Sequence, residues 1–304
     1  MENMDHSLLV EKYRPNKLEN YVGNENIKKS ISKYLDQNDI QNLIFYGPAG
    51  TGKTTLAKLI VANLDCDHIY INASDERGIE TIRDKVFSFA SVASFKPIKV
   101  VILDEADFLT IQAQASLRNI IETFSRTTRF IMTCNYIERI IDPLQSRCQT
   151  FKIIPPSKKE IAIHLYNILE SENITHINED IKNIVLNNYP DLRRMINTIQ
   201  ANTIDNHLDL PDNLLITSSY MESVLDELCK PKPNLKSIRQ IIQNSGVNDF
   251  EEMFGFLYDN ASKYLPNKEG TVALLINEHA YKANFRIDKE INLIALIQQL
   301  INNK

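Results

Sequence analysis

The segment from Gly47 to Thr54 constrains this chain most, because it reads G-P-A-G-T-G-K-T and fits the phosphate-loop pattern G-x-x-x-x-G-K-[ST]. Its glycines let the backbone turn tightly and direct successive N–H groups at an anion. Residues 42–46 before it are short and apolar, as in a buried strand, and residues 55–64 after it have helical apolar spacing. A strand, loop and helix in this order hold phosphates at the helix N-terminus. The chain is therefore expected to bind a nucleotide.

The residues of this loop are predicted to bind different parts of ATP and its Mg²⁺ ion. Lys53 supplies positive charge to the β- and γ-phosphates, and the Thr54 hydroxyl can join the coordination shell of Mg²⁺. An alternative, a glycine-rich turn that binds nothing, fits poorly with a strand and a helix in register on either side. The remaining loop residues expected to surround the nucleotide are Gly47, Pro48, Ala49, Gly50, Thr51, Gly52 and Thr55.

A second motif begins where the apolar run 99–103 ends in Asp104-Glu105-Ala106-Asp107. Asp104 is placed to hold Mg²⁺, usually through water, and Glu105 to polarise the water that attacks the γ-phosphate. Acidic strand ends are common, but this one follows a phosphate loop by about fifty residues, which is typical of an ATPase. The two motifs together predict hydrolysis of ATP with Mg²⁺.

Strands and helices alternate through the first half of the chain, which predicts a parallel sheet covered by helices on both faces. The other expected strands are 67–72, 128–133 and 149–154, and the other expected helices are 27–35, 79–89 and 112–124. The pair Pro155-Pro156 closes this α/β part, and the strand signal stops there. Helical patterns then cover 158–172, 178–188 and 191–202, and after the polar stretch 205–213 the chain is helical to its end, with breaks at 231–233 and 265–267. Three domains are predicted, spanning 1–156, 157–206 and 207–304.

Composition narrows the class of protein. The chain has 304 residues with a net charge of −5, which argues against a generally basic nucleic-acid binder without excluding a local basic track. No apolar segment approaches the length of a membrane span, and the first residues lack the pattern of a signal peptide, so a cytoplasmic location and no membrane partner are expected. The four cysteines have no C-x-x-C spacing, which favours reduced thiols.

Taken together, the motifs resemble the small subunits of replication factor C, the sliding-clamp loaders among the AAA+ ATPases. The resemblance is dense through residue 200 and rests on helical pattern and length after about Asn206. Residues 89–95, Phe-Ala-Ser-Val-Ala-Ser-Phe, are similar to the ATPase subunit of loaders from T4-like phages. The segments that carry the resemblance are 11–15, 47–54, 72–78, 103–107, 116–118, 133–135, 143–148 and 190–194.

This resemblance implies a fold and several site residues. The fold would be an α/β AAA+ domain with a RecA-like parallel sheet, a small helical lid domain and an all-α collar domain. Asn135 would be a sensor at a strand tip, and Arg193 would reach the γ-phosphate from the lid. Arg147 would be an arginine finger for the neighbouring subunit's site, where a rigid cationic fork suits the charge of the transferring phosphoryl group. The adenine pocket would be lined by Tyr13, Arg14, Pro15 and Val22.

The resemblance also implies a function and partners. The chain would use ATP to open a ring-shaped clamp and load it onto primer–template DNA during replication, together with other loader subunits in a pentameric hetero-oligomer. Plausible DNA-phosphate contacts are Arg77, Arg83 and Gln112, because arginines and helix N-termini favour anions. The alternative reading of these three residues is ordinary solvated surface.

Three other classes of protein compete with a clamp loader. Asp104-Glu105-Ala106-Asp107 spells the name of the DEAD-box helicases, but those need a second RecA-like domain, and only helices are expected after Pro156. Another AAA+ machine, such as a replication initiator or branch-migration motor, is less consistent with segments 11–15 and 146–148. A scaffold subunit that binds nucleotide without hydrolysing it is disfavoured by Lys53, Asp104, Glu105 and Arg147.

Overall fold

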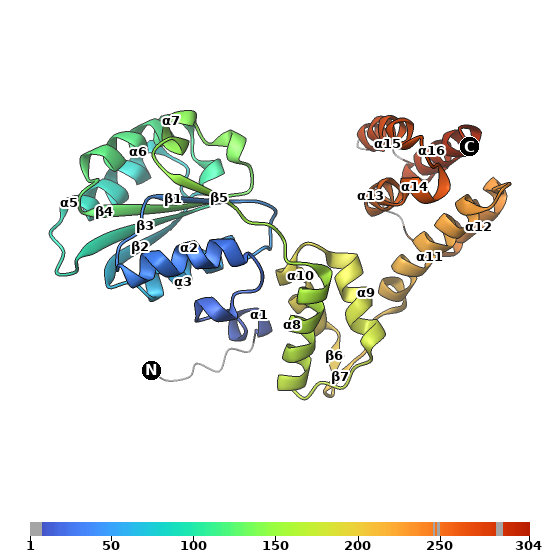
Figure 1. Cartoon of the computed structure of the whole chain (residues 1–304), viewed down its shortest axis with the longest axis horizontal. Coiled ribbons are helices and arrows are strands. Elements are labelled where there is room, and N and C mark those ends of the chain that lie inside the picture. The colour runs from blue at the N-terminus through green and yellow to red at the C-terminus, as the bar shows by residue number, and fades with distance from the viewer. Residues whose placement is uncertain (1–7, 246, 248–249, 284–287) are drawn as a thin grey trace. The chain divides into compact units, whose positions relative to one another are not determined.

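The computed structural model describes residues 8–245, 247, 250–283 and 288–304 (Figure 1). The chain divides into two compact units. Unit 1 comprises Met1–Thr175 and Asn188–His207, and unit 2 comprises His176–Asn187 and Leu208–Lys304. The division into three domains at 156 and 206 stays a prediction.

A five-stranded parallel sheet forms the centre of unit 1 and confirms the expected α/β architecture. Its strand order is β2-β3-β4-β1-β5. Because all the strands are parallel, the loop that follows β1 and the carboxyl ends of β3 and β4 lie at the same edge of the sheet. Ligands bind at this edge in such folds. The strands are β1 (Leu43–Tyr46), β2 (Cys66–Asn72), β3 (Ile98–Asp104), β4 (Thr128–Cys134) and β5 (Gln149–Lys152).

Helices cover both faces of this sheet (Figure 1). Helices α2 (Glu25–Asp36) and α3 (Lys53–Ala62) lie on one face, and α6 (Ile111–Thr123) and α7 (Asp142–Gln145) lie on the other. Strand β3 is buried along its whole length, and its side chains alternate between the two layers. Val100 and Ile102 pack in the core with α2 and α3, whereas Val101 and Leu103 pack in the core with α6. This arrangement explains the continuous apolar run in the sequence.

Two expectations about regular structure are wrong in detail. The single helix expected over 79–89 is broken into α4 (Ile79–Thr81), a π-helical turn (Ile82–Phe87) and α5 (Ser88–Ser91). The strand signal does not stop at Pro156, because β6 (Thr203–Ile204) and β7 (His207–Leu208) form a short hairpin. Asp205 and Asn206 turn this hairpin with φ values of 48° and 58°, as a type I′ turn needs.

The remaining helices confirm the expected helical second half. Ser157 and Glu160 form the reciprocal capping bonds predicted at the start of α8. The helices of this second half that belong to unit 1 are α8 (Lys158–Ser171) and α10 (Leu192–Ala201). The first half of the chain also contains α1 (Leu9–Lys12) and short 3-10 helices at Leu18–Asn20, Ala106–Phe108 and Ile137–Arg139. The others are α9 (Asn178–Asn188), α11 (Asp212–Cys229), α12 (Leu235–Ser245), α13 (Glu251–Asp259), α14 (Ala261–Tyr264), α15 (Glu269–Ala283) and α16 (Lys289–Asn302).

Unit 2 has its own hydrophobic core. Val224, Leu257 and Leu296 are among its fully buried members and come from α11, α13 and α16. All four cysteines of the chain are free. Among the described residues, no helix has both the length and the apolar character needed to cross a membrane.

Candidate active site

The phosphate loop joins β1 to α3 in a conformation that requires glycine. Gly47, Gly50 and Gly52 have φ values of 145°, 71° and 91°, which L side chains rarely adopt. A Cβ atom on Gly47 would lie 2.4 Å from the carbonyl oxygen of Ile153, and one on Gly50 would lie 1.9 Å from an Asp191 carboxylate oxygen. Helix α3 begins at Lys53, so the unpaired N–H groups of its first turn adjoin the loop. The backbone therefore forms an anion cradle that fits nucleotide phosphates.

Lys53 connects this loop to the tip of β4. Its Nζ donates to the carbonyl oxygens of Gly47 at 2.9 Å and Pro48 at 2.8 Å, and to Asn135 Oδ1 at 2.8 Å. The side chain is 8% exposed, and burial lowers the pKa of Lys53, although nearby acidic groups such as Asp104 oppose this shift. The three oxygens that accept hydrogen bonds from this buried ammonium group are neutral, so a bound anion would stabilise its charge. The structure thus brings Lys53 and Asn135 together.

The carboxylate of Asp104, at the end of β3, accepts hydrogen bonds from three hydroxyl groups. Its Oδ1 accepts from Thr54 at 2.7 Å and from Thr133, and its Oδ2 accepts from Tyr70 at 2.6 Å. Burial and the bond to Asp104 raise the pKa of Tyr70, so its hydroxyl keeps its proton. Mg²⁺ prefers oxygen ligands and uses one or two carboxylates with phosphate oxygens. The Thr54 and Asp104 oxygens are a donor set that fits this ion.

Glu105 follows Asp104 in the left-handed region, at φ 55°. Its backbone N–H donates to Thr133 Oγ1 at 3.1 Å, and its side chain lines the same pocket as Lys53. Among the described residues, nothing makes a hydrogen bond or ion pair with the Glu105 carboxylate. This carboxylate is therefore available to orient a water molecule.

Asp107 completes the acidic motif from a buried position. It is 7% exposed, and its Oδ2 accepts the N–H groups of Asn135 at 3.3 Å and Tyr136 at 3.4 Å. Its Oδ1 is buried without a hydrogen-bond partner. Asp107 thus holds the backbone that presents Asn135 to Lys53, a role that the sequence alone did not reveal.

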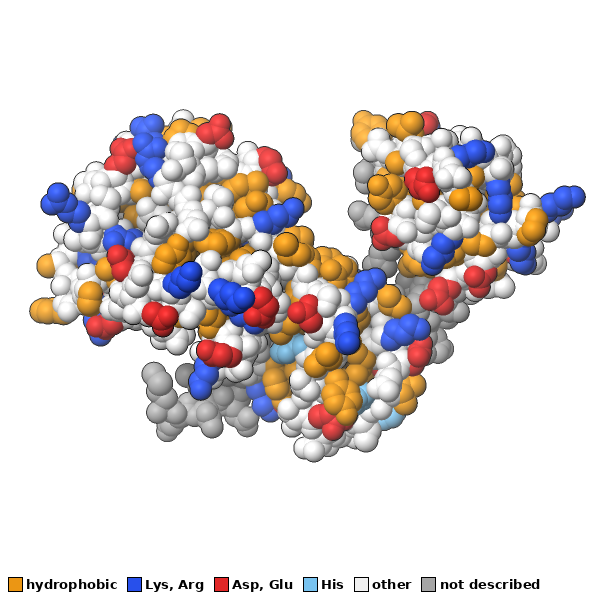
Figure 2. All heavy atoms as spheres, viewed as in Figure 1, with side chains coloured by type: hydrophobic (Ala, Val, Ile, Leu, Met, Phe, Trp, Pro, Cys, Tyr) orange, Lys and Arg blue, Asp and Glu red, His pale blue; other side chains and the backbone are white. Residues whose placement is uncertain are grey.

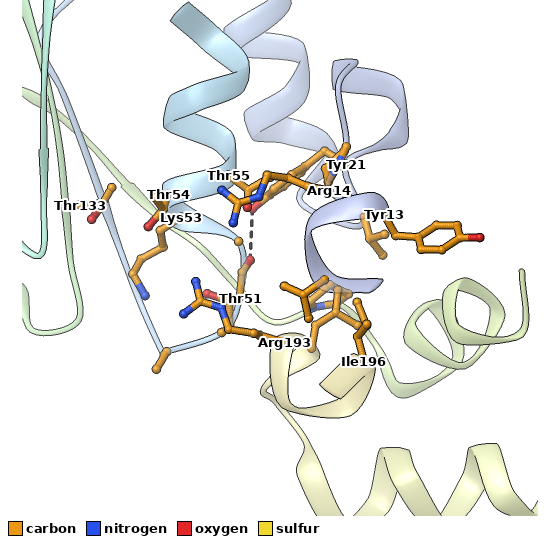
Figure 3. A pocket seen from close by; sticks show the side chains of 18 of the residues that line it. Tyr13, Arg14, Tyr21, Thr51, Lys53, Thr54, Thr55, Thr133, Arg193 and Ile196 are labelled. Carbon is orange, nitrogen blue, oxygen red and sulfur yellow. Dashed lines mark hydrogen bonds between the residues drawn. The ribbon is translucent and has the colours of Figure 1, made fainter. Parts of the chain in front are cut away.

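The pocket around the loop contains every residue predicted for the adenine end (Figure 3). The Tyr13 ring points away from the loop in Figure 3, and its hydroxyl donates to Glu172, the residue that follows α8. Arg14 pairs with Glu11 at 2.6 Å. The structure adds wall residues that the sequence analysis missed, which are Val10, Asn20, Tyr21, Thr133, Cys134, Pro156, His164, Leu192 and Ile196.

Tyr21 is the missed residue most closely tied to the loop. It is 4% exposed, and its hydroxyl donates to the Thr51 carbonyl oxygen at 3.3 Å, drawn as the dashed line in Figure 3. A Cβ on Gly52 would lie 3.0 Å from the Tyr21 ring. Its position beside Val22 was a usable signal, whereas nothing in the sequence marks His164 or Ile196.

Arg193 reaches the pocket from α10. Asp191 begins this helix by accepting the Arg194 N–H at 3.0 Å, and the same carboxylate lies against Gly50. Figure 3 shows the Arg193 side chain extending toward the same side of the pocket as Lys53. Arg193 thus lines the pocket that contains the phosphate loop, and its contact with the γ-phosphate stays a prediction.

Arg147 lies outside this pocket, in the segment just before β5. Its Nε donates to Glu122 Oε1 at 2.7 Å, its Nη2 donates to the same oxygen, and its Nη1 donates to the Pro143 carbonyl oxygen at 2.7 Å. It lines a second, polar cavity together with Arg129. Arg147 therefore does not line the nucleotide pocket of its own chain. Its role as an arginine finger in the site of a neighbouring subunit stays a prediction.

The candidate DNA contacts are exposed and also lie outside the nucleotide pocket. Arg77 donates from Nε to the Ser74 carbonyl oxygen at 2.8 Å and stacks 5.1 Å from the centre of the Phe108 ring. Arg83 lies on the π-helical turn, and Gln112 lies in the first turn of α6. On the face shown in Figure 2, acidic and basic side chains are interspersed. DNA contact by these three residues stays a prediction.

The sheet, glycine loop and acidic strand end define a P-loop nucleotide hydrolase of the AAA class. Residues 43–156 match the ATPase family associated with various cellular activities (AAA). The chain is 33% identical over 313 residues to the replication factor C small subunit of Sulfurisphaera tokodaii, covering 96% of this chain and 94% of that protein. The chain belongs to the replication factor C small subunits.

Two other relatives agree with this assignment. The replication factor C small subunit of Archaeoglobus fulgidus is 36% identical over 252 residues, covering 80% of this chain and 78% of that protein. That of Halobacterium salinarum is 44% identical over 199 residues, covering 63% of this chain and 62% of that protein. The nearer likeness to loaders of T4-like phages stays a prediction.

Solved structures support the fold. The RuvB Holliday junction branch migration motor of Thermotoga maritima matches with a TM-score of 0.55 and 17% sequence identity, over 85% of this chain and 91% of that chain. A single-residue variant of the same protein matches with a TM-score of 0.54 and 16% identity over 94% of this chain and 91% of that chain. At this identity the likeness concerns the fold alone and does not favour branch migration.

Proposed function

We propose that this chain is an ATPase subunit of a sliding-clamp loader, which uses ATP to open a ring-shaped clamp and place it on primer–template DNA during replication. The observation that carries the proposal is the match to a replication factor C small subunit along nearly the whole chain. The pocket supports it, since it holds a cationic loop, an acidic strand end and a cation from α10.

In this proposal the chain's own residues divide the work of hydrolysis. The base of ATP lies between the segment 13–22 and α10, and the phosphates lie in the loop. Lys53 exchanges its carbonyl partners for phosphate oxygens, while Asn135 is left to hold water near the γ-phosphate. Glu105 orients and polarises that water. Thr54 and Asp104 would hold Mg²⁺, which would supply positive charge beside the phosphates. Arg193 contacts the γ-phosphate from α10.

The assembly is part of the same proposal. Arg147 completes the site of a neighbouring subunit, where such a finger contributes ~10³–10⁵ in rate. The partners are other loader subunits in a pentameric hetero-oligomer, a sliding clamp and primer–template DNA, with the protein in the cytoplasm. Arg77, Arg83 and Gln112, repeated by several subunits, would contact duplex phosphates without reading bases. Residues 157–206 would be the lid and 207–304 the collar.

Two substitutions separate binding from hydrolysis. Lys53→Ala removes the loop's only side-chain cation and should abolish measurable ATP binding by calorimetry. Glu105→Gln keeps the shape of the side chain but not its charge, so it should bind ATP with near wild-type affinity and lower turnover by at least about 100-fold. Wild-type turnover by Glu105→Gln would remove Glu105 from its proposed role.

A further inference from the structure

The hydroxyl of Tyr70 contacts Asp104, a residue of the nucleotide pocket, and the roles proposed for the acidic motif do not explain this contact. Tyr70 lies on β2, an edge strand, and pairs in register with Ile102 of β3. In a strand, residues two apart share a face, so Tyr70 and Asp104 project toward the same side of the sheet as Ile102. The long tyrosine side chain spans this offset and donates its hydrogen to Asp104 Oδ2 at 2.6 Å.

The Tyr70 ring also lies beside α3. The Lys58 Nζ lies 4.7 Å from the centre of this ring, at the distance of a cation–π contact. Thr54, which bonds the other Asp104 oxygen, lies one helical turn earlier on α3. Tyr70 is 42% exposed, so water can reach this side chain. The stability of the fold therefore does not require the bond from its hydroxyl to Asp104, because water could take its place.

We propose that Tyr70 is a positioning residue for Mg²⁺, which holds the Asp104 carboxylate in the orientation that the ion needs. This inference rests on the proposed function, in which Thr54 and Asp104 hold the ion. If the Thr54 hydroxyl bound Mg²⁺ instead of Asp104, the carboxylate would keep two of its three hydroxyl partners, Tyr70 and Thr133. Outer partners of this kind orient metal ligands, and their loss typically costs about 10–100-fold in metal affinity or activity.

The test compares the dissociation constant of ATP, measured by calorimetry on the full chain, in EDTA and across a series of Mg²⁺ concentrations. Tyr70→Phe removes one oxygen and keeps the ring. It should leave ATP affinity in EDTA unchanged. It should also raise, by about tenfold, the Mg²⁺ concentration at which half of the Mg²⁺-dependent change in ATP affinity is reached. Lys58→Met is the matched control, because it removes the cation over the ring but leaves the hydroxyl, and its Mg²⁺ titration should match wild type.

The other outcomes for Tyr70→Phe and Asp104→Asn also decide whether the inference holds. An unchanged Mg²⁺ titration for Tyr70→Phe, with or without a lower melting temperature in EDTA, would show a structural role only and overturn the inference. Asp104→Asn separates this failure from failure of the proposed function. If Asp104→Asn abolishes the Mg²⁺ effect while Tyr70→Phe does not change it, only the role of Tyr70 is lost. If Asp104→Asn leaves the Mg²⁺ effect intact, the ion is not held as proposed.

Discussion

His164 shows how a single residue of the pocket wall responds to its environment. It lies on α8 and lines the nucleotide pocket with Ile196 of α10. Burial lowers the pKa of His164 below its usual value, so the folded protein favours the neutral imidazole. The unfolded chain binds a proton more readily, which makes the stability of the fold depend on pH through this residue.

The sign of this dependence gives a prediction. Because the folded pKa of His164 is lowered, its contribution to stability is fully present above the unfolded value of about 6.5 and is lost as pH falls below it. His164→Gln cannot be protonated, so its melting temperature should decline less than that of wild type between pH 7.5 and pH 5. His68→Gln, at an exposed position of β2, is the matched control and should follow wild type. Parallel curves for all three proteins would contradict the prediction.

At the scale of elements, Gln114 of α6 joins three segments of unit 1. It is 1% exposed, its Nε2 donates to the carbonyl oxygens of Leu109 at 3.1 Å and Arg139 at 3.0 Å, and its Oε1 accepts the Ile141 N–H at 2.9 Å. One amide therefore fixes the loop between β4 and α7, which leads to Arg147. A glutamine in the first turns of a helix reads as surface in the sequence, so this link could not be predicted.

Replacing this amide has a measurable cost. Gln114→Leu keeps the approximate volume but leaves buried backbone groups without partners, and each such group costs about 1–3 kcal/mol. Unit 1 of Gln114→Leu should therefore unfold at clearly lower urea concentration than wild type. The exposed neighbour serves as control, since Gln112→Leu should change the free energy of unfolding by no more than about 0.5 kcal/mol. Equal midpoints for the two variants would show that the buried bonds do not stabilise the fold.

At the scale of the whole molecule, the features that could be predicted from the sequence are those that residue chemistry and hydrophobic periodicity determine. The glycine loop 47–54 and the position of Asp104 and Glu105 in the same pocket could be predicted, because few residue types fit a phosphate loop and an acidic strand end at that spacing. The parallel sheet followed from alternating strands and helices. The break of helix 79–89 and the hairpin at 203–208 could not be predicted, because a π-helical turn has no residue signature and the turn Asp205-Asn206 lacks the usual glycine.

Sharing of the active site between subunits is a prediction about the assembly. Arg147→Ala should keep ATP affinity, because Arg147 lies outside its own chain's pocket, and should lower the ATPase rate of the assembled complex by ~10³ or more. Mixing Arg147→Ala with Lys53→Ala subunits should restore activity at interfaces that combine an intact loop with an intact finger. Inactive mixtures, with assembly verified by size, would argue against a finger acting in trans.

The measurement that tests the central claim most directly is the ATPase rate of the assembled protein with primer–template DNA and a ring-shaped clamp, added singly and together. A clamp loader couples hydrolysis to both ligands, so the rate should be highest when both are present, and Glu105→Gln should remove the response. A rate indifferent to DNA and clamp, in an assembly that binds both, would contradict the assignment.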